Sequence, residues 1–262
     1  MKSKFLFTIS LFSLLFISFS YAQNSTKPDP KLEIYLLLGQ SNMAGRGDIT
    51  TEFSKIENAN VFTLNKANEW VLAKHPLHFD KPSATGVGPG LSFGIKMAEA
   101  NPKVKIGLVP CAVGGTSISQ WSAGKYDKAT DTHPYDDAII RIKEAMKTGV
   151  IKGMLWHQGE SDTSPEKSAV YLEKLQILID KIRTLCNNPN LPVVVGELGV
   201  FKENRRIINE IIAPLPSKVS FTAIAKSDGL EQKGDGAHFN SESAQILGYR
   251  FAEKMLELQK KK

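Results

Sequence analysis

The chain has 262 residues, of which 42% are hydrophobic and 23% are charged, and it contains two cysteines. This length allows one large domain or two small ones, and the composition excludes disordered, collagen-like, coiled-coil and disulfide-scaffold chains. The formal net charge of +6 does not indicate a nucleic-acid partner, because five of the excess lysines lie at the two ends of the chain, at positions 2, 4 and 260–262.

Residues 1–22 have the pattern of a secretion signal. Two lysines precede an apolar run over residues 5–19, which is too short for a comfortable membrane span, and Ser-Tyr-Ala at 20–22 is a small-x-small cleavage site. We therefore expect an exported protein, periplasmic or extracellular, with no stable membrane insertion after cleavage. The alternative is an amino-terminal anchor that stays uncleaved.

The rest of the chain is expected to consist of a polar, flexible lead-in at 23–30 and one domain at 31–262. Short apolar runs predict buried strands at 32–38, 104–109, 150–156, 192–196 and 219–225. Longer amphipathic runs predict helices at 91–100, 135–148, 165–185, 204–212 and 241–259. Because strands alternate with helices, we expect an α/β fold in which helices cover a central parallel sheet of about five strands. The least regular segment, 45–90, is expected to hold loops and minor strands at one edge.

Polar residues gather directly after the predicted strands and near the carboxyl terminus, where open parallel sheets place their functional groups. Four segments stand out, with the sequences GQSNMAGRG at 39–47, CAVGGTSI at 111–118, WHQGESD at 156–162 and DGAHF at 235–239. The first puts Ser41 at a turn after a strand, although Met43 breaks the Gly-x-Ser-x-Gly pattern. The second contains paired glycines, whose backbone N–H groups suit an oxyanion. No phosphate-binding glycine loop is found, so nucleotide binding is not expected.

Together these segments contain the groups needed for acyl transfer. A serine hydroxyl such as that of Ser41 needs an adjacent base, and His238 could take its proton and later protonate the leaving alcohol. Asp235 precedes His238 by three residues and could hold the imidazole by one nitrogen. A tetrahedral oxyanion needs fixed donors, for which the candidates are the N–H groups of Ser41 and Gly115 and the side-chain amide of Gln158.

In their order along the chain, these four segments resemble the motifs of the SGNH hydrolase superfamily. More narrowly they are similar to carbohydrate esterase family 6, which includes acetylxylan esterases, and to the related sialate O-acetylesterase-like domains. The resemblance extends from about Leu32 to Glu257. It implies a flavodoxin-like three-layer α/β fold and a serine-dependent esterase that removes acetyl groups from an O-acetylated saccharide, with no cofactor or metal. Acetylated xylan, a related polysaccharide and an O-acetyl sialic acid are the substrates that it leaves open.

The resemblance also implies roles for individual residues. The family's nucleophile corresponds to Ser41, its base to His238 and its glycine oxyanion donor to the Gly114-Gly115 pair, of which Gly115 is favoured. This chain departs from the wider superfamily at Gln40, where GDSL enzymes have an aspartate, and that residue is expected near the substrate. It also lacks the superfamily's oxyanion asparagine, which Gln158 is expected to replace.

Three assignments stay open at this stage. Asp235 is favoured as the acid that orients the imidazole, but Glu160 could do so instead, or could hold Gln158 or Arg46. Trp121, which follows the paired glycines, could stack on a sugar ring or simply pack. The alternative functions are a lipase-like or thioesterase-like hydrolase of the same superfamily and a sugar-binding module without catalysis.

Overall fold

The computed structural model describes residues 28–260 and is built around a seven-stranded sheet with the strand order β3-β2-β4-β1-β5-β6-β7. The strands are β1 (Asp29–Gly39), β2 (Val61–Leu64), β3 (Trp70–Leu72), β4 (Lys105–Pro110), β5 (Gly149–His157), β6 (Val193–Gly196) and β7 (Thr222–Ala225). All neighbours pair in parallel except β3, which runs antiparallel to β2. The parallel sheet is confirmed, and β2 and β3 add two strands at the edge that the irregular segment 45–90 was expected to form.

The central strand β1 divides its side chains between two cores. Ile34, Leu36 and Leu38 belong to one hydrophobic cluster, whereas Tyr35 and Leu37 belong to the other, and all five are fully buried. Successive side chains of a strand point to opposite faces, so a strand covered on both faces must be apolar without interruption. This explains why residues 34–38 form a continuous apolar run instead of an alternating one.

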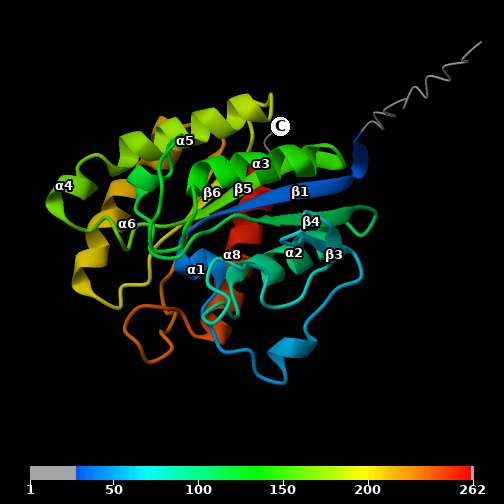
Figure 1. The fold of residues 1–262 in the computed structure, drawn as a ribbon, viewed down its shortest axis with the longest axis horizontal. Coiled ribbons are helices and arrows are strands. Elements are labelled where there is room, and N and C mark those ends of the chain that lie inside the picture. The colour runs from blue at the N-terminus through cyan, green and yellow to red at the C-terminus, as the bar shows by residue number, and fades with distance from the viewer. Residues whose placement is uncertain (1–27, 261–262) are drawn as a thin grey trace, which may run out of the picture.

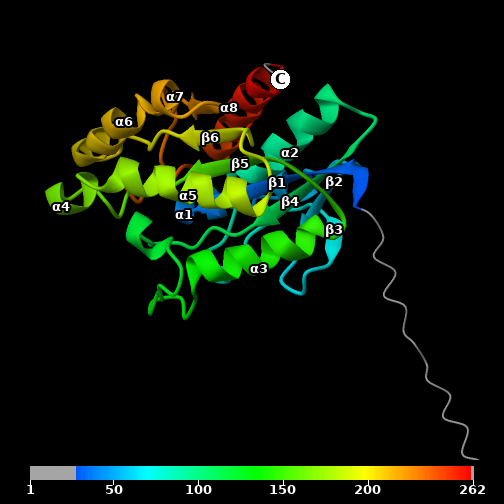
Figure 2. The same cartoon turned by 90° about the horizontal axis from the view of Figure 1, so that it is seen from above.

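Helices cover both faces of the sheet and give three layers, which Figure 1 shows from the side and Figure 2 from above. On one face α2 and α8 pack against each other, and on the other lie α3, α5 and α6. The helices are α1 (Ser41–Ala44), α2 (Pro89–Ala100), α3 (Pro134–Met146), α4 (Pro165–Ser168), α5 (Tyr171–Leu185), α6 (Arg206–Ile212), α7 (Leu215–Lys218) and α8 (Ser241–Gln259). The helix-covered α/β fold is therefore confirmed.

Several boundaries differ by a few residues from the sequence-based expectation, among them the start of the strand predicted at 219–225, which is Thr222, and two differences change how the chain is divided. The predicted helix at 165–185 is divided into α4 and α5 by Ala169 and Val170. The predicted lead-in at 23–30 ends earlier than expected, because β1 begins at Asp29, whose N–H donates to the Thr148 carbonyl at 3.0 Å. The predicted signal at 1–22 lies outside the described residues. Among residues 28–260, no helix combines the length and apolarity needed to cross a membrane.

The register of the sheet brings the ends of three strands together. In β1, Leu37 pairs with Pro110 of β4, and Gly39 pairs with His157 of β5. The segments that follow these strands therefore emerge side by side at the carboxyl edge of the sheet. These are three of the four polar segments that the sequence singled out.

Candidate active site

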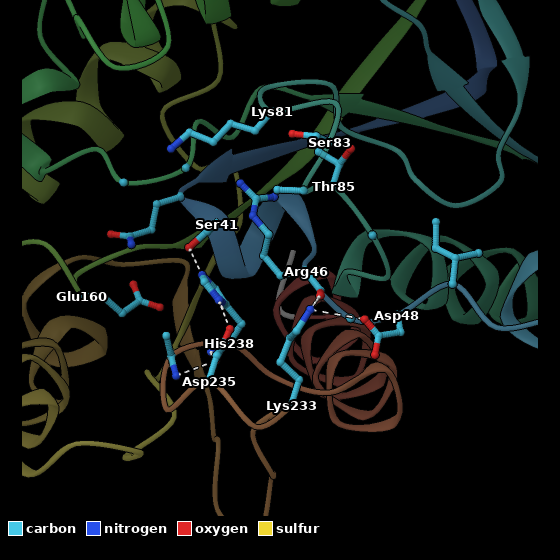
Figure 3. Close-up of a pocket in the computed structure, with 18 of the residues that line it drawn as sticks. Ser41, Arg46, Asp48, Lys81, Ser83, Thr85, Glu160, Lys233, Asp235 and His238 are labelled. Atoms are coloured by element: carbon cyan, nitrogen blue, oxygen red, sulfur yellow. Dashed lines mark hydrogen bonds and ion pairs between the residues drawn. The ribbon is translucent and has the colours of Figure 1, made fainter.

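A cavity of about 840 Å³ lies where the polar segments meet. Its wall includes residues from all four of them, among them Ser41, Gly115, Glu160 and His238. Figure 3 shows Ser41 and His238 facing each other in this cavity. The volume lies within the range of about 300–1,000 Å³ that is usual for small-molecule sites.

Ser41 is the first residue of α1, a single helical turn that follows β1. The turn requires a glycine at position 39 for two reasons. The φ of Gly39 is 136°, a value that other residues rarely adopt, and a Cβ atom there would collide with the carbonyl of His157. The N–H of Gln40 donates to that same carbonyl at 2.9 Å and continues the pairing of β1 with β5. The Ser41 side chain is thus held at the end of the central strand, on the wall of the cavity.

Ser41, His238 and Asp235 form a continuous hydrogen-bonded chain. His238 Nε2 lies 3.0 Å from Ser41 Oγ, and His238 Nδ1 lies 2.7 Å from Asp235 Oδ2. The carboxylate accepts a hydrogen bond from Nδ1–H, so Nε2 carries the lone pair that faces the serine hydroxyl. This is the arrangement of a nucleophile, a base and an acid that orients the base.

Asp235 also fixes the backbone of the histidine. Its Oδ1 accepts the N–H groups of Ala237 and His238, both at 2.8 Å. Burial raises the pKa of Asp235, but the hydrogen bonds from the His238 ring and from the two N–H groups outweigh it and lower the pKa to about 2. The carboxylate is therefore charged at every pH at which a histidine normally titrates.

Glu160 lies on the wall of the same cavity but does not contact the imidazole. Its Oε1 accepts a hydrogen bond from Asn42 Nδ2 at 2.6 Å, and within residues 28–260 its buried Oε2 has no hydrogen-bond partner. It holds neither Gln158 nor Arg46, the other two partners that the sequence left open. The geometry thus favours Asp235 as the acid beside His238.

Asn42 was not identified from the sequence, although it directly follows Ser41. Its Nδ2 also donates to the Ala237 carbonyl at 3.2 Å, and its Oδ1 accepts the Phe239 N–H at 3.1 Å. The side chain therefore joins the serine turn to the segment that carries His238. The only signal in the sequence is a polar residue beside a buried strand, because such a side chain needs partners once it is buried.

Two backbone N–H groups on the wall of the cavity are free to bind an oxyanion. Within the part of the chain that the structure describes, the N–H groups of Ser41 and Gly115 make no hydrogen bonds. Gly115 has a φ of 90°, a conformation that favours glycine. Ser161 Oγ donates to the Gly115 carbonyl at 2.9 Å, so this glycine is held from one side.

The expectation that Gln158 supplies an oxyanion donor is corrected by its surroundings. The residue is only 1% exposed, and its Nε2 lies within hydrogen-bond distance of Gln40 Oε1 at 3.0 Å, the Thr116 carbonyl at 2.9 Å and Asp162 Oδ2 at 2.5 Å. Both protons of the Gln158 amide are therefore already hydrogen-bonded to buried acceptors and do not face the cavity. Gln158 instead supports Gln40, which lies on the cavity wall.

Trp121 does not contact the cavity, and the suggestion that it stacks on a sugar ring is wrong for this structure. The side chain is 3% exposed and meets the ring of Trp156 edge to face, with 5.1 Å between ring centroids. Its Nε1 donates to Thr116 Oγ1 at 3.1 Å. The indole is therefore part of the core, with its one polar atom satisfied.

Three cations on the cavity wall had no signal in the sequence: Lys81, Arg205 and Lys233. Arg205 is buried and donates to the carbonyls of Ala237 at 3.1 Å and Gly199 at 3.3 Å. It therefore supports the backbone next to His238.

One family model matches residues 31–257, and its description is carbohydrate esterase, sialic acid-specific acetylesterase. The match includes all four polar segments. A relative from Arabidopsis thaliana, the probable carbohydrate esterase At4g34215, is 33% identical over 248 residues, which cover 87% of this chain and 92% of the relative.

Solved structures show the same architecture. The X-ray structure of the Arabidopsis thaliana protein has a TM-score of 0.76 at 31% identity and covers 87% of this chain and 99% of its own. The crystal structure of NanS has a TM-score of 0.70 at 19% identity, and the match covers 90% of this chain and all of NanS (100%). At 19% identity, the similarity to NanS shows a shared fold.

Proposed function

The chain belongs to the carbohydrate esterase family of sialic acid-specific acetylesterases, and we propose that it removes O-acetyl groups from carbohydrates by a mechanism that uses Ser41, His238 and Asp235. Membership confirms the resemblance to sialate O-acetylesterase-like hydrolases that the four motifs predict. The observation that supports the serine mechanism is the hydrogen-bonded chain from Asp235 Oδ2 through the His238 ring to Ser41 Oγ.

In the first half of the proposed reaction, Ser41 Oγ attacks the acetyl carbonyl while His238 Nε2 takes the hydroxyl proton. Asp235 stabilises the imidazolium that forms. The free N–H groups of Ser41 and Gly115 donate to the tetrahedral oxyanion, and each such donor contributes about 10²–10³-fold in rate. The intermediate then collapses, His238 Nε2 gives its proton to the departing sugar oxygen, and an acetyl-serine remains.

In the second half, a water molecule replaces the sugar. His238 Nε2 takes a proton from this water as it attacks the acetyl-serine carbonyl, and the same N–H groups hold the second oxyanion. Collapse releases acetate, and the proton on His238 returns to Ser41 Oγ. Both halves use only groups that line the cavity.

Acetylated xylan or a related plant polysaccharide is the proposed substrate. The name of the family specifically favours a second candidate, an O-acetyl sialic acid. We also propose that the protein is exported to the periplasm or the extracellular space, on the basis of the signal pattern at residues 1–22.

The test is acetate release from acetylated xylan, from an O-acetyl sialic acid and from a small aryl acetate. Ser41→Ala is expected to lower kcat on every substrate that the wild type hydrolyses by about 10³-fold or more, because the nucleophile is lost. Ser217→Ala is a matched control, since this exposed serine on α7 only donates to the Pro214 carbonyl. Turnover that survives in Ser41→Ala would contradict the mechanism. Hydrolysis of the sialic acid ester alone would select the second substrate.

A further inference from the structure

A buried ion pair that the mechanism does not use lies next to the cavity. Arg46 Nη2 and Asp80 Oδ2 are 2.7 Å apart, with side-chain exposures of 6% and 2%. Arg46 belongs to the segment that contains Ser41, whereas Asp80 comes from the irregular segment between β3 and α2. Burial removes both charges from water, so such a pair adds little net stability on its own. Its contacts indicate a different role.

Each member of the pair holds one of the two segments that supply an oxyanion donor. Arg46 Nη1 donates to the Gly45 carbonyl at 2.7 Å, on the serine turn. Asp80 Oδ2 accepts the Gly114 N–H at 2.7 Å, on the segment with the paired glycines. The ion pair packs directly against Gly114: a Cβ atom at this position would collide with Arg46 Nη2 and would lie 2.8 Å from Asp80 Oδ2.

The peptide between Gly114 and Gly115 is thereby held on both sides. Asp80 fixes the N–H that precedes it, and Ser161 Oγ fixes the carbonyl that follows it. The N–H within this peptide is that of Gly115, which has no partner among residues 28–260. We propose that Asp80, held in place by Arg46, is a positioning residue that directs the Gly115 N–H toward the oxyanion; this inference rests on the proposed esterase function.

The charge of Arg46 explains why an aspartate can occupy this place. A lone carboxylate near a developing oxyanion would oppose it, and the opposition would be strong where water is excluded. Paired with Arg46, Asp80 supplies a strong acceptor for the Gly114 N–H while the pair stays neutral overall. The ion pair therefore fixes the donor without adding negative charge beside it.

The experiment measures kcat, KM and inhibition by phenylboronic acid, which forms a tetrahedral adduct with a nucleophilic serine. Asp80→Ala removes the acceptor and is expected to lower kcat by about 10²-fold, with KM changed less than about threefold, because the lost interaction acts in the transition state. The inhibition constant for phenylboronic acid should rise in parallel. Asp80→Asn keeps an oxygen acceptor and should lose only about tenfold.

Two further variants separate positioning from stability. Gly114→Ala displaces the pair from the glycine side and should reproduce the loss in kcat even if Asp80→Ala does not fold. Glu197→Gln is the matched control: Glu197 is 10% exposed, pairs with Lys226 at 2.7 Å and accepts the Ser227 N–H, but it lies outside the cavity wall. This control should lower stability and leave kcat within about twofold.

The outcomes distinguish this inference from the proposed function. Folded Asp80→Ala or Gly114→Ala protein with a wild-type kcat would overturn the inference, as would a loss in kcat with unchanged boronic acid inhibition. A wild-type protein without Ser41-dependent turnover would overturn the proposed function itself.

Discussion

At the scale of single residues, Asp235 uses its two oxygens for two tasks. Oδ1 closes the turn that leads to His238, and Oδ2 accepts a hydrogen bond from the imidazole Nδ1–H. A spacing of three residues suffices for both, which is why the sequence alone could favour this acid. Glu160 is close in sequence to other polar groups, but its contact with Asn42 spans 118 residues and has no local signal.

Replacing each acid by its isosteric amide distinguishes the roles of Asp235 and Glu160. Asp235→Asn is expected to lower kcat by about 10³–10⁴-fold, because an amide cannot hold the correct tautomer or stabilise the imidazolium. Glu160→Gln keeps an oxygen that can accept from Asn42, so it should lose much less. Steady-state kinetics on an aryl acetate measures both. The reverse order of the two losses would show that Glu160 is the orienting acid.

Other residues show what a sequence cannot predict. The proposed roles of Ser41 and His238 follow from residue types placed directly after strands or before a helix. The Asp80 contact with Gly114 joins positions 34 residues apart, and Gln158 turns its amide away from the cavity because its neighbours offer acceptors there. Such choices depend on the tertiary arrangement and not on local pattern.

At the scale of elements, long apolar and amphipathic runs predicted the inner strands and the longer helices. The break between α4 and α5 was missed, because both pieces have the same amphipathic period. In the structure, Tyr171 at the start of α5 is buried, accepts from Trp156 Nε1 and donates to the Gln158 carbonyl. These contacts with the end of β5 fix where α5 begins.

The core position of Trp121 leads to a prediction about stability. Trp121→Ala removes a buried ring from the layer between the sheet and α5, and should lower the free energy of unfolding by about 3–5 kcal/mol. Urea unfolding measures this, with Trp70→Ala on the partly exposed edge strand β3 as the comparison and expected to lose less. A raised KM for oligosaccharides with unchanged stability would restore a sugar-stacking role.

At the scale of the whole molecule, the two buried histidines His78 and His157 and the partly buried His75 link stability to pH. Burial lowers the pKa of His75 and of His78 to about 4, and it also lowers the pKa of His157. In the unfolded chain a histidine titrates near 6.5, so below about pH 6.5 the unfolded chain binds more protons than the folded one. The stability from neutral histidines is therefore complete above about pH 6.5 and is lost as the pH falls toward about 4.

The expected result is a urea midpoint that falls between pH 7 and pH 4.5. Each histidine with a pKa near 4 contributes at most about 3 kcal/mol to this change. His78→Asn should reduce the difference between the two midpoints, although it also lowers stability at pH 7. His133→Asn, at an exposed position, should leave the difference unchanged. A midpoint independent of pH would contradict the linkage.

The strand order has a consequence for the time at which the enzyme becomes active. Ser41 and the paired glycines follow β1 and β4, which are neighbours in the middle of the sheet. His238 follows β7, at one edge of the sheet, and lies just before α8. The residues that we propose as nucleophile and oxyanion donors are therefore synthesised early, and the proposed base is synthesised almost last. A chain that ends before α8 lacks the helix that follows His238, so we expect ester hydrolysis only from a chain that includes α8.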